Sequence, residues 1–466
     1  MDFRLTLPSL NAGVPLFQRG FEPQEADLKL GPLFFKLRAL EAAVLHSDNI
    51  NLTPDNTESG TIAYLGLTLD VVAQFTEDLR LAASFTLVYL PLENRGGIVG
   101  FNSGADLFNF GLATGPLTHV QATWDTDIGG WHVVFTDDFQ ISTGYYSGGI
   151  DGNYVLFEGS PFDENLQTRT GRYALGPASG GALRRGDANF DNQLDAGRQS
   201  DVIVFSNIIS ADAERLDPGS ILLRARVYHE DLWYNQGNRG LPSLREGATI
   251  SLISQRENMR FKPYVVYDLF HTKVEDQNLV QNIVRAGFAG PITEQLRLQA
   301  ELGYFNGGQA DSGWLWRVAL DHNAGPYTQE SLIYARTFNY FHNEINEGVG
   351  YTIHQVLGPR LDASAYTYRL RVQDYFDGEQ ATRDEWLFGL RVTFIAGPKT
   401  TVQLTGEYTA EDSGTRQMIG RADIGYNLTD TLLLHLAYQY QESKSDVFDL
   451  NFRENLIFLS VTKYFR

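Results

Sequence analysis

Apolar and polar residues alternate with a period of two along much of the chain. The pattern is clear in segments 295–304, 364–373, 386–394, 401–410 and 432–440, where apolar residues occupy one parity and polar or small residues the other. Successive side chains of a β-strand point to opposite faces, so each segment predicts a strand with one apolar and one polar face. A helical period is almost absent, which predicts an all-β protein.

The predicted strands are long, and their connections alternate between two kinds. Each strand runs about 10–14 residues, whereas strands of soluble proteins most often have about 5–6. Short connections lie at 75–79, 127–130, 217–220, 291–295, 323–326, 357–360, 396–400 and 427–431. Longer polar connections lie at 46–59, 91–116, 145–200, 235–245, 272–277, 306–311, 374–383 and 442–454. Short turns on one side and long loops on the other are typical of an outer-membrane barrel.

These features predict a single large transmembrane β-barrel, antiparallel and up-and-down, with short periplasmic turns and long extracellular loops. We expect about 20 strands, with about 18 as the alternative count because the segments near 117, 201 and 246 alternate poorly. Residues 1–32 would form an N-terminal periplasmic segment or a strap across the barrel mouth, and residues 33–466 the barrel with its long extracellular loop 145–200. The strands are predicted to begin near residues 33, 60, 79, 117, 131, 201, 219, 246, 260, 278, 294, 312, 327, 345, 361, 384, 400, 415, 431 and 455.

The composition narrows the class of protein. A net charge of -20 argues against nucleic-acid binding. Cysteine is absent, as is common in exported bacterial proteins, and the 12% aromatic residues and 45 glycines suit interfacial girdles and tight turns. Residues Met1–Pro8 contain no basic segment followed by an apolar stretch, so no signal peptide is visible. We therefore interpret the chain as a mature or trimmed form of a protein of the bacterial outer membrane.

The parity opposite the apolar one should face the barrel lumen. Unpaired, a ladder of arginines there would repel itself, so it must meet acids, water or an anionic solute. For each single arginine, pairing with a carboxylate is the expected structural role. The candidate pore-lining residues are Arg80, Arg224, Arg226, Arg260, Lys262, Arg297, Glu301, Arg317, Asp321, Arg369, Arg371, Arg391 and Glu407.

The loop 145–200 is far longer than the others and rich in acids. It would either fold into the lumen, opposite the basic wall, or cap the outer mouth. Within it, segment 186–195 reads GDANFDNQLD and spaces its oxygen-bearing side chains as a calcium-binding loop does. Position 12 is Arg198 and not an acid, so a polar Asx-rich turn is the alternative. The candidate calcium ligands are Asp187, Asn189, Asp191, Gln193 and Asp195.

The segment LRALEAAVLHSDNINLT at 37–53 resembles the first hairpin of the β-barrel porin group. The final strand, ending at Phe465, resembles the terminal strand that barrel-assembly machinery reads, although Lys463 interrupts its apolar parity and Arg466 follows the aromatic residue. The acidic third long loop and basic wall are similar to the arrangement of general porins, and the size and basic lumen are similar to those of alginate-export barrels. The resemblance to the porin group implies a porin and no particular substrate, whereas the similarity to alginate-export barrels suggests an anionic polysaccharide as the alternative solute.

No enzymatic site can be identified. The sequence contains no HExxH, no cysteine cluster and no GxSxG, and its nine histidines are unrelated in spacing, so we predict no enzyme and no required cofactor. We predict an outer-membrane pore for small polar or charged solutes. The alternatives are a selective exporter or importer of an anionic polysaccharide, a plugged surface or structural barrel, and a soluble or secreted β-protein. Expected partners are outer-membrane lipid, lipopolysaccharide and small polar or anionic solutes; a homo-trimer stays open because many porins are trimers.

Overall fold

The fold is known from a computed structural model. It describes residues 23–49, 57, 59–90, 95–98, 118–143, 203–217, 220–234, 243–256, 258–274, 277–307, 312–325, 327–339, 344–376, 379–412, 414–444 and 451–465. No helix among these residues has the length and hydropathy needed to span a membrane.

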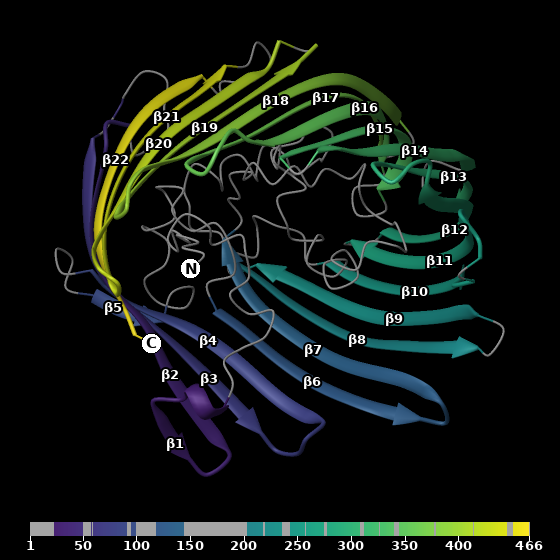
Figure 1. The fold of residues 1–466 in the computed structure, drawn as a ribbon, viewed down its shortest axis with the longest axis horizontal. Coiled ribbons are helices and arrows are strands. Elements are labelled where there is room, and N and C mark those ends of the chain that lie inside the picture. Colours follow the sequence, from purple (N-terminus) through teal and green to yellow (C-terminus); the bar gives the residue numbers. More distant parts are fainter. Residues whose placement is uncertain are drawn as a thin grey trace.

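In the described part of the chain, twenty strands form one closed antiparallel barrel (Figure 1). Each strand pairs with the next along the chain, and the last strand pairs with the first, Ser47 lying opposite Leu456. Closure gives every barrel strand two neighbours, so no sheet edge is left to meet lipid. The barrel strands are β2 (Leu33–Ser47), β3 (Gly60–Gln74), β4 (Leu79–Leu90), β6 (Thr118–Ile128), β7 (Trp131–Thr143), β8 (Ile203–Asp217), β9 (Ile221–Tyr234), β10 (Ser243–Ser254), β11 (Lys262–Val274), β12 (Gln277–Pro291), β13 (Leu296–Gly307), β14 (Ser312–Gly325), β15 (Thr328–Asn339), β16 (Glu344–Val356), β17 (Leu361–Phe376), β18 (Glu379–Gly397), β19 (Thr400–Glu411), β20 (Arg416–Thr429), β21 (Leu432–Lys444) and β22 (Phe452–Tyr464).

Three short elements are added to this ring. The 3-10 helix η1 (Pro23–Glu25) precedes β1 (Leu28–Leu30), which pairs with the start of β2 and extends one end of the barrel. Gly31 makes the tight β1–β2 turn at a φ of 62°, a conformation that suits glycine. β5 (Arg95–Ile98) pairs with the end of β4. The division of the chain at residue 32 stays a prediction, because residues 1–22 and the loop 145–200 lie outside the described residues.

The predicted strand count and order are confirmed. β2, β3, β4 and β7 begin at the predicted residues, and β18 differs most, since it begins at Glu379 and not near 384. The three poorly patterned segments form β6, β8 and β10, so the barrel has 20 strands. Alternation was weak in these strands, yet their ladders with both neighbours are continuous.

Two of the predicted long loops are mostly strand. β17 and β18 run 16 and 19 residues, and Phe376 pairs with Glu379, so only 377–378 connects them where a loop over 374–383 was expected. The expected loop 272–277 is likewise reduced to 275–276. Polar residues in these segments do not end the strands, because the backbone ladder continues and satisfies their peptide groups.

The outward face is apolar and the inward face is polar in large part. Trp314, Leu302 and Leu390 point outward and are 59%, 56% and 51% exposed, while Asp268 and Glu230 point inward and are 3% and 1% exposed. A soluble protein has the opposite arrangement. An apolar belt around a closed barrel instead matches the hydrocarbon core of a membrane.

Candidate functional site

The inner wall of the barrel is the candidate functional site, and strand register shows which residues face it. Directly paired residues on neighbouring strands point to the same face. Glu301 pairs with Arg317, and Arg297 pairs with Asp321, all on the inward parity. The predicted residues at inward positions are Arg80, Arg224, Arg226, Lys262, Arg297, Glu301, Arg317, Asp321, Arg391 and Glu407. Whether they line a conducting path stays a prediction.

Arg369 and Arg371 do not face the lumen. Arg369 pairs across β17–β18 with Trp386, which belongs to the outward belt, and its guanidinium lies 5.0 Å from the ring centroid. Arg371 is 55% exposed on the same outer face. The expectation that these two line the pore is therefore wrong. The more apolar parity of β17 points inward, where Tyr368 and its neighbours pack against other inward apolar side chains.

The prediction that Arg260 lines the pore is also wrong. It precedes β11, in the connection from β10, and its side chain is exposed. Its Nε donates a 2.6 Å hydrogen bond to the carbonyl of Pro291, on the next turn of the same barrel end. Arg260 therefore ties two turns together and contributes no inward charge along a strand.

A buried ion-pair network crosses β10 to β13 on the inner wall. Arg285 Nη2 lies 2.7 Å from Asp268 Oδ2, and Arg285 Nη1 lies 3.7 Å from Glu301 Oε1. The Thr249 hydroxyl donates to the other oxygen of Asp268 at 2.8 Å, and the Tyr264 hydroxyl donates to Glu301 at 2.8 Å. Arg285, Asp268 and Glu301 are only 15%, 4% and 7% exposed. The Arg285 guanidinium thus lies beside two carboxylates that water hardly reaches, and Arg317, the direct cross-strand partner of Glu301, adds a second positive charge beside Glu301.

A second set of pairs joins β8 to β9 and is more open. Arg224 Nε lies 3.2 Å from Glu214 Oε2, and Arg226 Nε lies 3.5 Å from Asp212 Oδ1. Both carboxylates are 46% exposed, and the two arginines are 23% and 18% exposed. These two pairs are more exposed than the network around Arg285.

A third set lies on β18 to β21. Arg421 Nε binds Asp423 Oδ1 at 2.9 Å, and His435 Nε2 lies 3.3 Å from the same oxygen. Arg383 Nε binds Glu385 Oε1 at 2.6 Å. In all three sets an inward arginine lies beside an inward carboxylate, so the arginines of these sets are charge-compensated.

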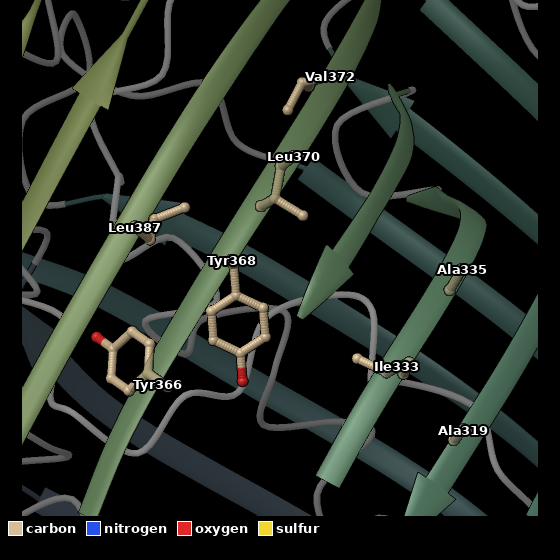
Figure 2. Packing of buried hydrophobic residues seen from close by; sticks show 8 residues of the cluster. All are labelled: Ala319, Ile333, Ala335, Tyr366, Tyr368, Leu370, Val372 and Leu387. Carbon is tan, nitrogen blue, oxygen red and sulfur yellow. The ribbon is translucent and has the colours of Figure 1, made fainter. Parts of the chain in front are cut away.

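The inner wall also has an apolar sector, formed by inward residues of β14 to β18 (Figure 2). Figure 2 shows Tyr366 and Tyr368 on β17, with Leu387 on the adjacent strand. Tyr368 lies over Gly350 and Tyr366 over Gly389, so closely that a Cβ on either glycine would come within 2.3 Å and 2.1 Å of a ring carbon. The glycines therefore make room for flat tyrosines against the barrel wall. The sector comprises Ala319, Ile333, Ala335, Tyr366, Tyr368, Leu370, Val372 and Leu387.

Arg285, Arg383, Arg421 and Asp423 belong to the site but escaped the sequence-based selection. Arg285 follows an inward apolar residue, Ile283, so its strand shows no simple apolar-polar alternation. Arg285 pairs with inward residues on the two neighbouring strands, and this register would have placed it on the inner face. Polarity along a single strand is a weaker guide to facing than pairing across strands.

The structure does not test the predicted calcium-binding site. Asp187, Asn189, Asp191, Gln193 and Asp195 lie outside the described residues. Within the described residues, no group of three or more His, Cys, Asp or Glu side chains is arranged to hold a metal ion. Calcium binding by segment 186–195 stays a prediction.

Comparisons with known proteins show a shared fold but do not assign this chain to a family. No family model matches the chain. No curated protein matches it either. Among solved structures, the FrpB iron transporter of Neisseria meningitidis aligns with a TM-score of 0.51 and 8% identity, covering 92% of this chain and 81% of that one. The siderophore receptor PirA of Pseudomonas aeruginosa aligns at a TM-score of 0.49 and 10% identity, covering 92% and 80%.

The barrel fold and the apolar belt on its outer face both indicate where the protein lies in the cell. The chain is a large β-barrel of the bacterial outer membrane. The alignment to FrpB supports an outer-membrane barrel and not the particular porin group that segment 37–53 resembles. At 8% identity the likeness extends to the fold alone.

Proposed function

We propose that this barrel carries small polar or charged solutes across the outer membrane. The observation that supports this function is a closed ring of 20 strands with a band of charged side chains on its inner face. Barrels of about 16–18 strands enclose an aqueous channel, so a ring of this size has room for one. Charged side chains along the wall would replace part of the hydration of a polar solute.

The pairing of charges on the wall indicates weak charge selectivity. Arg224 and Arg226 each lie beside a carboxylate, and Arg285 lies beside two. The field of such pairs decays quickly, whereas a track of uncompensated arginines would attract anions over a longer range. This compensation favours small solutes of either sign over an anionic polysaccharide.

Planar-bilayer recording with a salt gradient tests the proposal. The refolded full chain should form steady channels with a reversal potential close to zero in a potassium chloride gradient. Asp212→Asn with Glu214→Gln should remove the negative charges beside Arg226 and Arg224 and move the reversal potential toward that of chloride. Glu347→Gln, a carboxylate on the outer face, is the matched control and should leave the reversal potential unchanged. Equal shifts in both variants, or none in either, would contradict a conducting path along this wall.

A plugged transporter is the second candidate, supported by the burial of inward apolar side chains. Tyr368, Phe305 and Phe458 are 1%, 0% and 0% exposed. An open aqueous lumen would expose inward side chains and would be polar. The FrpB protein, which shares the fold, is by name an iron transporter. Heat-modifiable, correctly folded protein that gives no steady conductance would support this candidate and contradict the open pore.

A further inference from the structure

Three cations gather on the outer surface near the extracellular ends of β20, β21 and β22. Arg416, Lys444 and Arg453 are all exposed on the outward parity, and we name them the rim cation cluster. Lys444 Nζ and Arg453 Nε lie 2.8 Å and 3.0 Å from the same oxygen, Glu442 Oε1. The other oxygen of Glu442 accepts a 3.0 Å hydrogen bond from the Tyr440 hydroxyl. The Glu442 carboxylate thus has three partners and one negative charge to offset two cations, and Lys444 and Arg453 remain 57% and 67% exposed.

The rim cation cluster contains more positive charge than its described neighbours compensate. Arg416 and Lys444 are direct cross-strand partners, and like charges placed directly opposite each other are destabilising. Two more exposed carboxylates lie near this end of the barrel among the described residues. Asp48 is engaged by Asn455, whose backbone N and Nδ2 both donate to it at 2.7 Å. Asp412 lies in the turn before Arg416, so Glu442 and Asp412 together still leave three cations facing two carboxylates. In a chain with a net charge of -20, a local excess of cations on a membrane-facing surface calls for an anionic partner.

The height of the rim cation cluster identifies where that partner lies. On β21 the outward residues from Leu432 to Tyr440 are apolar or aromatic. Eight residues at about 3.4 Å each span about 27 Å along a strand, and a tilt of about 35–45° reduces this to about 19–22 Å, most of the roughly 25 Å apolar band of an outer-membrane barrel. Tyr438 and Tyr440 therefore mark the outer interface, and Lys444 lies just beyond it, level with lipid headgroups.

We propose that Arg416, Lys444 and Arg453 bind a phosphate group of a glycolipid in the outer leaflet of the outer membrane. Arginine and lysine donate charge-assisted hydrogen bonds to phosphate oxygens, which are roughly twice as strong as neutral ones. The lipid's acyl chains would lie along the apolar belt below, over Ile457 and Leu459, which are 49% and 46% exposed. A free phosphate ion offers the same headgroup chemistry without the acyl contact. This site is independent of the solute that the barrel carries.

A second group of outward arginines, on β15 and β17, provides a control of equal charge on another part of the outer surface. Arg336 lies 3.6 Å from Glu347, and Arg371 binds Asp384 through two hydrogen bonds. Arg369 is stacked on Trp386 and lies 3.5 Å from the same Asp384. Here each arginine has a carboxylate beside it, so the group has less charge to offer a lipid phosphate.

The experiment measures lipid binding to the full chain in detergent. Bisphosphorylated lipid A, enzymatically dephosphorylated lipid A and inorganic phosphate are the three probes, with binding read by native mass spectrometry. The variant Arg416→Gln/Lys444→Gln/Arg453→Gln should weaken binding of the phosphorylated lipid about tenfold or more. The control Arg336→Gln/Arg369→Gln/Arg371→Gln should change it less than about threefold. Lys444→Arg should keep the affinity, because it keeps the charge.

Three results would overturn the proposal. Equal losses in both triple variants would show diffuse attraction to basic surface, and equal affinity for dephosphorylated lipid would show that phosphate is not recognised. Displacement of the lipid by millimolar inorganic phosphate would assign the cluster to a free anion. Folding is checked by heat-modifiable migration, and the single variant Lys444→Gln repeats the test with minimal disturbance.

Discussion

The buried pair of Arg285 and Asp268 allows a quantitative test of the inner wall. Arg285→Met removes the guanidinium that lies beside both Asp268 and Glu301, whose side chains are 4% and 7% exposed, while Arg317 remains opposite Glu301. Breaking a buried ion pair costs about 3–5 kcal/mol, because the remaining charge is left uncompensated. The Thr249 hydroxyl still donates to Asp268, which offsets part of that penalty. We expect the free energy of unfolding to fall by about 3 kcal/mol, the low end of that range.

The assay is reversible urea unfolding in phospholipid vesicles, followed by the fluorescence of the chain's 6 tryptophans. Asp268→Asn and the double variant complete a cycle, and the coupling between the two positions should be about 1–3 kcal/mol. Arg371→Met is the matched control, because Arg371 binds Asp384 at 2.9 Å but is 55% exposed on the outer face. Its unfolding midpoint should stay where it is, since an exposed ion pair contributes little.

Equal shifts for Arg285→Met and Arg371→Met would refute this reasoning. They would mean that the inner wall is as wet as the outer rim, and that the short distances around Arg285 carry no more energy than a surface pair. A small shift for Arg285→Met together with weak coupling to Asp268 would lead to the same conclusion. Only a large, coupled loss agrees with a compensated and nearly dry network.

Two further predictions concern packing and facing. Gly389→Ala would put a Cβ 2.1 Å from Tyr366 Cε1, so the ring must move. The free energy of unfolding should therefore fall by about 1–3 kcal/mol. An unchanged urea midpoint would contradict the close approach of the ring. Because the chain has no cysteine, single spin labels can be placed at Leu404→Cys, on the outward parity, and at Gln403→Cys, on the inward parity. Oxygen should relax the label at residue 404 more than an aqueous nickel reagent does, with the reverse at residue 403, and identical accessibility at both positions would disprove the assigned faces.

Strand positions could be read from the sequence because the membrane imposes one rule on most of the strands. The lipid-facing parity must be apolar over about 25 Å, so alternation repeats even where individual residues vary. This is why β3, β4 and β7 begin where alternation predicts. The long extracellular connections obey no such rule, and the candidate calcium ligands fall in one of them.

Facing could not be read from a single strand where the apolar parity points into the barrel. In β17 one parity contains Tyr366, Tyr368, Leu370 and Val372, and the other contains Arg369. The rule that the more apolar parity meets lipid therefore selected the wrong face. The inward tyrosines and aliphatic side chains bury one another in a sector of the lumen, and that packing leaves no trace in the period of a single strand.

The correct face of β17 was nevertheless encoded in the chain, in its turn. Residues 377–378 are Asp-Gly, the strongest short-range signal for a two-residue hairpin. A two-residue connection pairs Phe376 with Glu379, and counting back along both strands brings Arg369 opposite Trp386. Since Trp386 shares its parity with Phe388 and Leu390 on an unmistakably lipid-facing strand, Arg369 must share that face. The residues of the turn fix the pairing register of the two strands. The register then shows which residues of an ambiguous strand share a face with those of a clear one. The arginines of a barrel should therefore be assigned to the inner or outer face from pairs of strands and not from single strands.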